Sequence, residues 1–175
     1  MVDRVILTGF MCAGKTSVGR ALAERLGWAF LDFDETIERR EGRRVADIFR
    51  ERGEAYFRAC EARLTDEVAR RREIVLASGG GWAVQPELVR RLRPGSLLVW
   101  LRVRPETAHA RHLAQGGDAR PLLAGADPLQ AIVSILAARE AAYAQADLWI
   151  DTDAREPAAI AAEIETRVRA TGPST

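Results

Sequence analysis

A chain of 175 residues, of which 47% are hydrophobic and 29% charged, has the length and composition of a globular protein that buries a core without disulfides. The net charge of +1 argues against a nucleic-acid or anionic-membrane partner, and no apolar run is long enough to span a membrane. Cys12 and Cys60 do not form a metal-binding or redox pair. The first strand follows the chain start without a targeting leader, so we expect a cytoplasmic protein. We also expect the protein to act as a monomer.

The first predicted strand, residues 4–7, leads into a phosphate-binding loop. The segment from Gly9 to Thr16 matches the pattern G-x-x-x-x-G-K-[ST] at every position, and apolar residues at helical spacing follow it up to Leu26. In this motif the glycines let backbone N–H groups face phosphate oxygens, the lysine reaches the β- and γ-phosphates, and the Thr16 hydroxyl ligates Mg²⁺. Lys15 is the only lysine among 26 lysines and arginines, which marks a position where a compact charge has to fit.

Strand, loop and helix come in the order that the motif requires, so we interpret the match as a nucleotide site rather than a chance glycine-rich turn. Cys12, inside this loop, is interpreted as a small space-filling residue rather than a reactive thiol. The expected nucleotide contacts are Met11, Cys12, Ala13, Gly14, Lys15, Thr16 and Ser17.

A second strand is predicted over residues 28–33, with two carboxylates at its end. Asp32 and Asp34 lie where the strand reaches the carboxyl edge, at which parallel α/β sheets bind ligands. Their spacing of two places both on one side if the strand continues, although we expect the chain to turn at Asp34.

Residues 35–72 are predicted to be helical throughout. Apolar residues recur at helical spacing, Gly42 and Gly53 break the pattern into pieces, and no strand signal is present. We therefore interpret this insertion beside the sheet as a subdomain for a second substrate.

A third buried strand over residues 74–78 ends in three glycines. Glycines at the carboxyl end of a central strand let the backbone approach a ligand where a Cβ would collide. A flexible loop is the alternative, but the phosphate loop at the same sheet edge favours a ligand contact. The three residues are Gly79, Gly80 and Gly81.

The rest of the chain alternates between the two element types, with helices predicted over residues 86–92, 105–113, 129–143 and 157–168 and strands over 96–101 and 148–151. Between two of these helices, residues 115–127 are polar, rich in glycine and include Arg120, which is typical of a lid that closes over phosphates. The predicted architecture is one three-layer α/β domain over residues 1–175, with a five-stranded parallel sheet, a helical insertion and a lid loop.

Two other groups of residues are assigned no role in the site. His109 and His112 lie three apart on a predicted helix, but no third ligand is near in sequence, so we expect a solvated helix face rather than a metal site. Trp28, Trp100 and Trp149 fall in predicted strands and are expected in the core.

Five segments beyond the phosphate loop resemble, in order, motifs of the shikimate kinase family, in the nucleoside monophosphate kinase branch of P-loop proteins. They are F-x-D-x-D-x-x-I-E from Phe30 to Glu38, G-E-x-x-F-R-x-x-E from Gly53 to Glu61, the glycine triplet, R-P-L-L from Arg120 to Leu123 and R-x-x-x-Y from Arg139 to Tyr143. The resemblance covers nearly the whole chain and implies a P-loop kinase fold.

The resemblance implies an enzyme that transfers the γ-phosphoryl group of ATP, with Mg²⁺, to the 3-hydroxyl of shikimate for aromatic amino acid biosynthesis. It implies that Lys15, Asp34 and Arg120 are catalytic. It assigns shikimate to Asp34, Arg58, Gly79, Gly80, Gly81 and Arg139, with the arginines on its carboxylate and Asp34 on its hydroxyls. It assigns ATP also to Arg120, from the lid, and to Arg155, against the adenine, and assigns Mg²⁺ to Thr16 and, through water, to Asp32. These residue types suit phosphoryl transfer, which needs positioning and charge neutralisation.

The chain departs from the family pattern at positions near the expected acceptor pocket. Trp82 follows the glycine triplet where a small residue is usual, and Phe33 stands between the two aspartates, so either side chain can reshape the pocket. Two alternatives therefore stay open: a related small-molecule kinase such as a gluconate kinase, and a non-catalytic nucleotide-binding regulator. A regulator would need no acceptor arginines, whereas this chain has Arg58 and Arg139.

Overall fold

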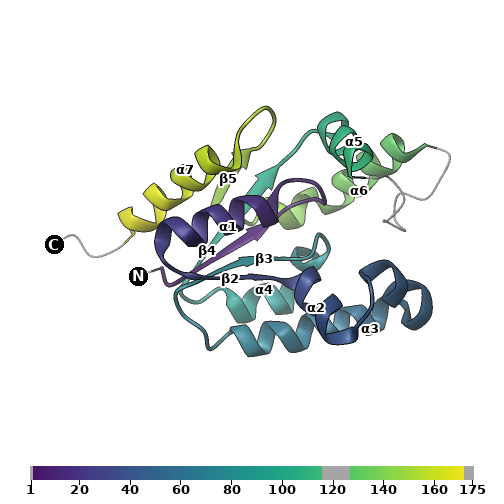
Figure 1. Cartoon of the computed structure of the whole chain (residues 1–175), viewed down its shortest axis with the longest axis horizontal. Coiled ribbons are helices and arrows are strands. Elements are labelled where there is room, and N and C mark those ends of the chain that lie inside the picture. Colours follow the sequence, from purple (N-terminus) through teal and green to yellow (C-terminus); the bar gives the residue numbers. More distant parts are fainter. Residues whose placement is uncertain (1, 116–126, 172–175) are drawn as a thin grey trace.

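The computed structural model describes residues 2–115 and 127–171, with a five-stranded parallel sheet in the order β2-β3-β1-β4-β5 (Figure 1). Its strands are β1 (Arg4–Thr8), β2 (Ala29–Asp32), β3 (Ile74–Ala77), β4 (Ser96–Arg102) and β5 (Leu148–Asp151). In the central strand β1, Val5 pairs with Val75 on one side and with Leu97 on the other. Because the strands are parallel, their carboxyl ends share one edge, and the phosphate loop follows β1 at the middle of that edge.

Side chains alternate between two hydrophobic cores on opposite faces of the sheet. Val5 and Leu7 of β1 belong to one core, while Ile6 between them belongs to the other. On β4, Val99 and Leu98 divide between the cores in the same way. This alternation has the period of two that a strand imposes, and burial on both faces explains the almost continuously apolar strand sequences.

Helices cover both faces of the sheet: α1 (Lys15–Leu26), α2 (Phe33–Glu41), α3 (Val45–Val68), α4 (Pro86–Leu92), α5 (Pro105–Ala114), α6 (Pro128–Tyr143), α7 (Pro157–Ala170) and a short 3₁₀ helix η1 (Trp82–Val84). The helices α1 and α7 lie side by side over the first core, and α2, α3 and α4 bury their apolar sides in the second (Figure 1). Within the described residues, no helix is long and apolar enough to cross a membrane.

The predicted fold class is confirmed, and glycines end or interrupt helices where the sequence indicated. Gly27 ends α1 with a left-handed φ of 69°, and Gly42 ends α2 with a φ of 63°. Gly53 interrupts α3 with a φ of 80° and a ψ of 167°, so the helical region between β2 and β3 is kinked as predicted. The short helix η1 after the glycine triplet was not predicted, because three residues carry no periodic signal.

The chain turns two residues earlier than predicted. The strand β2 ends at Asp32 because that carboxylate caps α2, so Phe33 begins the helix and Trp28 precedes the strand. The two aspartates therefore come from different elements: Asp32 ends a strand, and Asp34 lies in the first turn of a helix. The two carboxylates would lie on one side of the strand only if β2 continued to Asp34, and it does not.

Two further expectations about burial are wrong. Trp149 is 48% exposed, because β5 is an edge strand, although its ring packs against the buried Trp100 at 5.3 Å. His112 is buried rather than solvated, because α5 packs against α6. The predicted lid falls almost entirely on residues 116–126, which lie outside the described residues.

Candidate active site

The phosphate loop adopts a backbone that glycine makes possible at two positions. Gly9 and Gly14 have φ values of 135° and 91°, and a Cβ on Gly9 would also collide with the carbonyl oxygen of Leu101. The Lys15 ammonium donates hydrogen bonds to the carbonyl oxygens of Gly9 and Phe10, at 2.9 and 2.8 Å. The loop therefore curls around its own lysine, which places a positive charge inside the turn.

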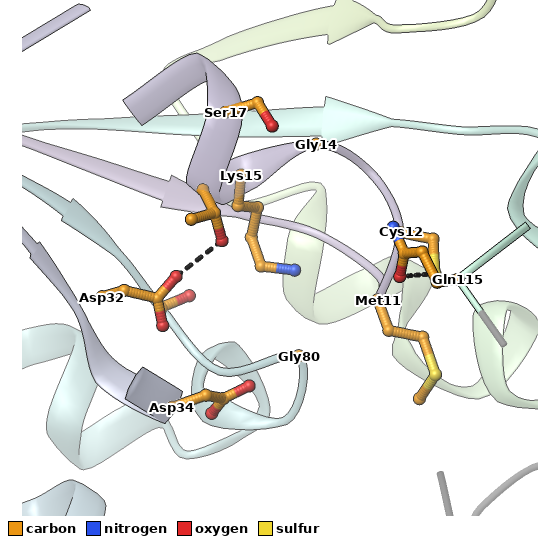
Figure 2. A pocket seen from close by; sticks show the side chains of 11 residues that line it. Met11, Cys12, Gly14, Lys15, Ser17, Asp32, Asp34, Gly80 and Gln115 are labelled. Carbon is orange, nitrogen blue, oxygen red and sulfur yellow. Dashed lines mark hydrogen bonds between the residues drawn. The ribbon is translucent and has the colours of Figure 1, made fainter. Parts of the chain in front are cut away.

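A cavity of about 200 Å³ opens in front of this loop. Figure 2 shows the side chains of Lys15, Asp32 and Asp34 facing this space. Oδ2 of Asp32 accepts a hydrogen bond from the Thr16 hydroxyl at 2.7 Å, and both groups are partly buried. The cavity is lined by Met11, Cys12, Gly14, Lys15, Thr16, Ser17, Asp32, Asp34, Ser78, Gly80 and Gln115.

A second cavity, of about 270 Å³, is also bordered by the phosphate loop and is lined by the predicted Arg155. Arg111, which the sequence did not single out, also lines it and donates hydrogen bonds to the carbonyl oxygens of Cys12 and Thr152, at 3.0 and 2.8 Å. Both arginines therefore line a cavity that residues of the phosphate loop also line. Nothing in the local sequence pattern distinguishes Arg111 from other helical arginines, because its partners are distant along the chain.

The glycine triplet contacts each of the three predicted acceptor side chains. A Cβ on Gly79 would lie 3.1 Å from Oδ1 of Asp34, and one on Gly80 would lie 3.5 Å from Nη1 of Arg139. On Gly81 a Cβ would collide with the Arg58 guanidinium. Each glycine therefore borders a different group, and the missing side chains leave room for all three.

The carbonyl of Gly80 holds the triplet against α6. Its oxygen accepts hydrogen bonds from Nη1 of Arg139 at 3.0 Å and from the Tyr143 hydroxyl at 2.6 Å. Gly80 also faces the phosphate loop, because a Cβ there would lie 3.6 Å from the backbone nitrogen of Met11. Arg139, one of the predicted acceptor side chains, and the phosphate loop thus meet at this residue.

Glu61 is a buried carboxylate beneath the triplet, with no role predicted although the family motif ends on it. It is completely buried, and Oε2 accepts hydrogen bonds from Arg58 at 2.6 Å and from Gln85 at 2.9 Å. Oε1 has no hydrogen-bond partner within the described part of the chain, and burial raises the pKa of this carboxyl although the positive charge of Arg58 opposes the shift. A buried acid thus holds Arg58, one of the predicted acceptor arginines, in place beside the glycine triplet.

Trp82 and Phe33 lie in the core rather than at the surface of the predicted acceptor pocket. Both are completely buried in the second core, where their rings pack edge to face at 6.2 Å, and Nε1 of Trp82 donates a hydrogen bond to the Thr65 hydroxyl at 3.0 Å. The sequence departures therefore alter the core behind the site rather than its lining.

The remaining predicted site features are the lid arginine and the metal ligands. Arg120 lies outside the described residues. Among residues 2–115 and 127–171 no group of three His, Cys, Asp or Glu side chains could hold a metal by itself. Both cysteines are free thiols, and Cys12 donates a hydrogen bond from Sγ to Oε1 of Gln115 at 3.7 Å (Figure 2).

A phosphate loop after the central strand of a parallel sheet, with aspartates and arginines gathered beside it, defines a P-loop kinase of small molecules. The family model for shikimate kinase matches residues 11–169. The chain belongs to the shikimate kinase family, and it is an ATP-dependent kinase with a hydroxyl group as acceptor.

Similar proteins align with this chain over almost its full length. The shikimate kinase of Moorella thermoacetica is 47% identical over 170 residues, which cover 97% of this chain and 96% of the relative. That of Persephonella marina is 39% identical over 165 residues, covering 94% and 98%. Among solved structures, the shikimate kinase from Acinetobacter baumannii in complex with shikimate matches with a TM-score of 0.91 and 33% identity, over 99% of this chain and 97% of that chain.

A gluconokinase from Sinorhizobium meliloti is also similar in structure, with a TM-score of 0.60 over 98% of both chains. Its sequence identity is only 20%, so this likeness shows a common fold and nothing more. The gluconate kinase alternative therefore gains no support from the comparison.

Proposed function

We propose that the protein transfers the γ-phosphoryl group of ATP to the 3-hydroxyl of shikimate. The observation that carries the proposal is the arrangement around the glycine triplet, where Asp34, Arg139 and Arg58 each border one glycine beside the phosphate loop. Shikimate offers a carboxylate and vicinal hydroxyls, so it has a partner for each of these charged groups. The similarity of this chain to shikimate kinases, over nearly its whole length, supports the same acceptor.

The acceptor half consists of Asp34, Arg58, Gly79, Gly80, Gly81 and Arg139. Arg58 and Arg139 bind the carboxylate, because guanidinium groups offer paired donors that fix the plane of a carboxylate. Arg58 is held by Glu61, which is buried, and by Glu54, whose side chain is 65% exposed. Glu54 is therefore the partner that the acceptor carboxylate displaces, while Glu61 continues to hold the arginine in place.

The nucleotide half consists of the loop from Met11 to Ser17, with Arg120 and Arg155. The backbone and Lys15 bind the phosphates, and Arg155 lies in the cavity beside the loop, where the nucleoside binds. The Thr16 hydroxyl and the Asp32 carboxylate, 2.7 Å apart, supply the oxygen donors that suit Mg²⁺. Two protein ligands suit this ion, because Mg²⁺ usually binds with ATP through one or two protein groups and keeps several waters.

Three residues carry the chemistry. Bound Mg²⁺ neutralises phosphate charge. Lys15 and Arg120 spread the charge that develops on the transferred group, and Asp34 orients the attacking hydroxyl and accepts its proton. Catalysis then rests on positioning, because no covalent intermediate with the protein is needed.

We further propose that the enzyme is one domain that acts as a monomer in the cytoplasm, with residues 35–72 as the acceptor subdomain and 115–127 as the lid. Light scattering of the purified protein tests the assembly state, and a dimer mass would contradict it.

The decisive experiment is ADP release by the purified protein with ATP, Mg²⁺ and a panel of hydroxy acids. Turnover with shikimate, and its loss with 3-deoxyshikimate, supports the proposal. Neutral shikimate amide should react poorly, because it lacks the charge that Arg58 and Arg139 bind. Turnover only with gluconate would assign the protein to another kinase activity, and no turnover with any acid would contradict the proposal.

A further inference from the structure

One carboxylate joins the helix behind the phosphate loop to the helix that carries Asp34. Oδ2 of Asp32 accepts a hydrogen bond from the hydroxyl of Thr16, in the first turn of α1, at 2.7 Å (dashed line at Asp32 in Figure 2). Oδ1 of the same side chain accepts a hydrogen bond from the backbone N–H of Glu35 at 3.1 Å and so caps α2. Each oxygen therefore holds the first turn of a different helix.

A second link lies one helical turn further along α1. Nη2 of Arg20 donates hydrogen bonds to both carboxylate oxygens of Glu35 at 2.8 Å. The side chains of this pair are 59% and 53% exposed, so water screens their attraction and the pair adds little. The partly buried contact between Thr16 and Asp32 is the stronger of the two links.

Asp34 is the second residue of α2, so its position depends on how the helix begins. An N-cap carboxylate fixes the first turn, because it satisfies a backbone N–H that has no partner within the helix. With Asp32 anchored by Thr16, the turn that bears Asp34 is held in register with the phosphate loop. Without that anchor, Asp32 still caps α2, but the helix start is no longer tied to α1.

We propose that Asp32 is a positioning residue that couples the nucleotide half of the site to the acceptor half, in addition to its part in metal binding. This inference rests on the proposed shikimate site. The Thr16 hydroxyl has one proton to donate and lone pairs left to accept or ligate, so the bond to Asp32 is compatible with a metal ligand role. Because coupling between two bound ligands is reciprocal, any factor by which nucleotide changes the affinity for the acceptor should equal the factor by which the acceptor changes the affinity for nucleotide.

The test measures shikimate binding by calorimetry in EDTA, without nucleotide. A role confined to the metal predicts wild-type affinity for every Thr16 or Asp32 variant under these conditions. Our proposal predicts that Thr16→Val, which removes the link but leaves the cap, raises the shikimate Kd about fivefold. Thr16→Ser should restore the affinity because it returns the hydroxyl, and Asp32→Ala should weaken binding further because it removes both bonds.

The matched control is Thr166→Val in α7, where the lost hydroxyl donates to the carbonyl oxygen of Ala162 in the same helix. This variant should bind shikimate as the wild type does. Arg20→Ala should change the Kd less than about twofold, because its ion pair with Glu35 is exposed. Unchanged affinity in both Thr16→Val and Asp32→Ala would overturn the proposal.

If the wild type does not bind shikimate, that result contradicts the proposed function and not the coupling role of Asp32. Amide hydrogen exchange of α2 then tests the coupling role by itself. Thr16→Val, a substitution in α1, should speed exchange of the Glu35 amide about fivefold, and Thr16→Ser should not. Exchange in α2 that is identical in all three proteins would show that the two helices are independent.

Discussion

Two cations of the proposed site, Lys15 and Arg139, are held by backbone carbonyls. Lys15 donates to the carbonyls of Gly9 and Phe10, and Arg139 donates to that of Gly80. These contacts fix where each cation points before any ligand binds, which lowers the cost of organising the site. Substitutions at these residues should therefore affect one ligand each.

Lys15→Ala should abolish turnover, with a fall in kcat of at least about 100-fold, because the transferred phosphate loses a preorganised positive charge. ADP release at saturating shikimate measures the loss. Shikimate affinity without nucleotide should stay within about twofold of wild type, since Lys15 serves the phosphates. A variant with near-normal kcat would exclude Lys15 from the transfer step.

Arg139→Ala should mainly raise the KM for shikimate, by roughly 10- to 100-fold, because one charge-assisted contact with the acceptor carboxylate is lost. The KM for ATP should change little. Arg104→Ala is the matched control, since the side chain of that arginine is 74% exposed and pairs with Asp153. If the shikimate KM of Arg139→Ala is unchanged, the carboxylate assignment is wrong.

At the scale of elements, one buried arginine, the first residue of β1, joins the C-terminal ends of two helices. Nη2 of Arg4 donates to the carbonyl of Ala69, just after α3, at 2.9 Å, and Nη1 donates to that of Leu92, at the end of α4, at 3.1 Å. Further bonds reach the carbonyls of Pro94 and Arg71. A cation here matches the negative ends of both helices and satisfies carbonyls that the helices leave open.

Arg4→Met should lower the free energy of unfolding by about 3 kcal/mol or more, because one buried and three partly buried carbonyls lose their donor. Urea unfolding measures the change. Arg72→Met is the control, as its side chain is 82% exposed and its removal should cost less than about 0.5 kcal/mol. Equal losses in the two variants would contradict the capping role of Arg4.

At the scale of the whole molecule, two glutamates respond to pH in opposite ways. The hydrogen bond from Arg40 lowers the pKa of Glu67, so this pair stabilises the fold above about pH 4.5 and the effect is lost as pH falls through the lowered pKa. Burial raises the pKa of Glu61, so its folded form favours the proton, and stability is lost as pH rises through the raised pKa. The buried acid of the site therefore costs stability near neutral pH.

Thermal unfolding between about pH 3 and 7 tests this contrast. The melting temperature of wild type minus that of Glu67→Gln should grow with pH by about 2 °C or less, because the pair is half exposed. The difference for Glu61→Gln should fall as pH rises. Parallel curves for both variants would show that neither carboxyl titrates differently on folding.

Local patterns in the sequence were sufficient to predict that the five strands and the phosphate loop exist and where α1 and α2 end, although not where β2 ends and α2 begins. They succeed because these features depend on neighbours in the chain: the left-handed Gly27 and Gly42 end their helices, and the loop from Gly9 to Thr16 is a continuous motif. The family motifs also located Asp34, Arg58 and Arg139, which the structure brings to one glycine triplet.

The sequence by itself determined the fold class, the family and the residues that gather at the sheet edge. Only the tertiary structure decided that Trp82 packs in the core rather than in the pocket, that Glu61 holds Arg58, and that Asp32 joins two helices. These facts depend on which residues meet across the fold. Pairing between distant segments is set by the packing of the whole sheet, so no local pattern of spacing or composition carries it.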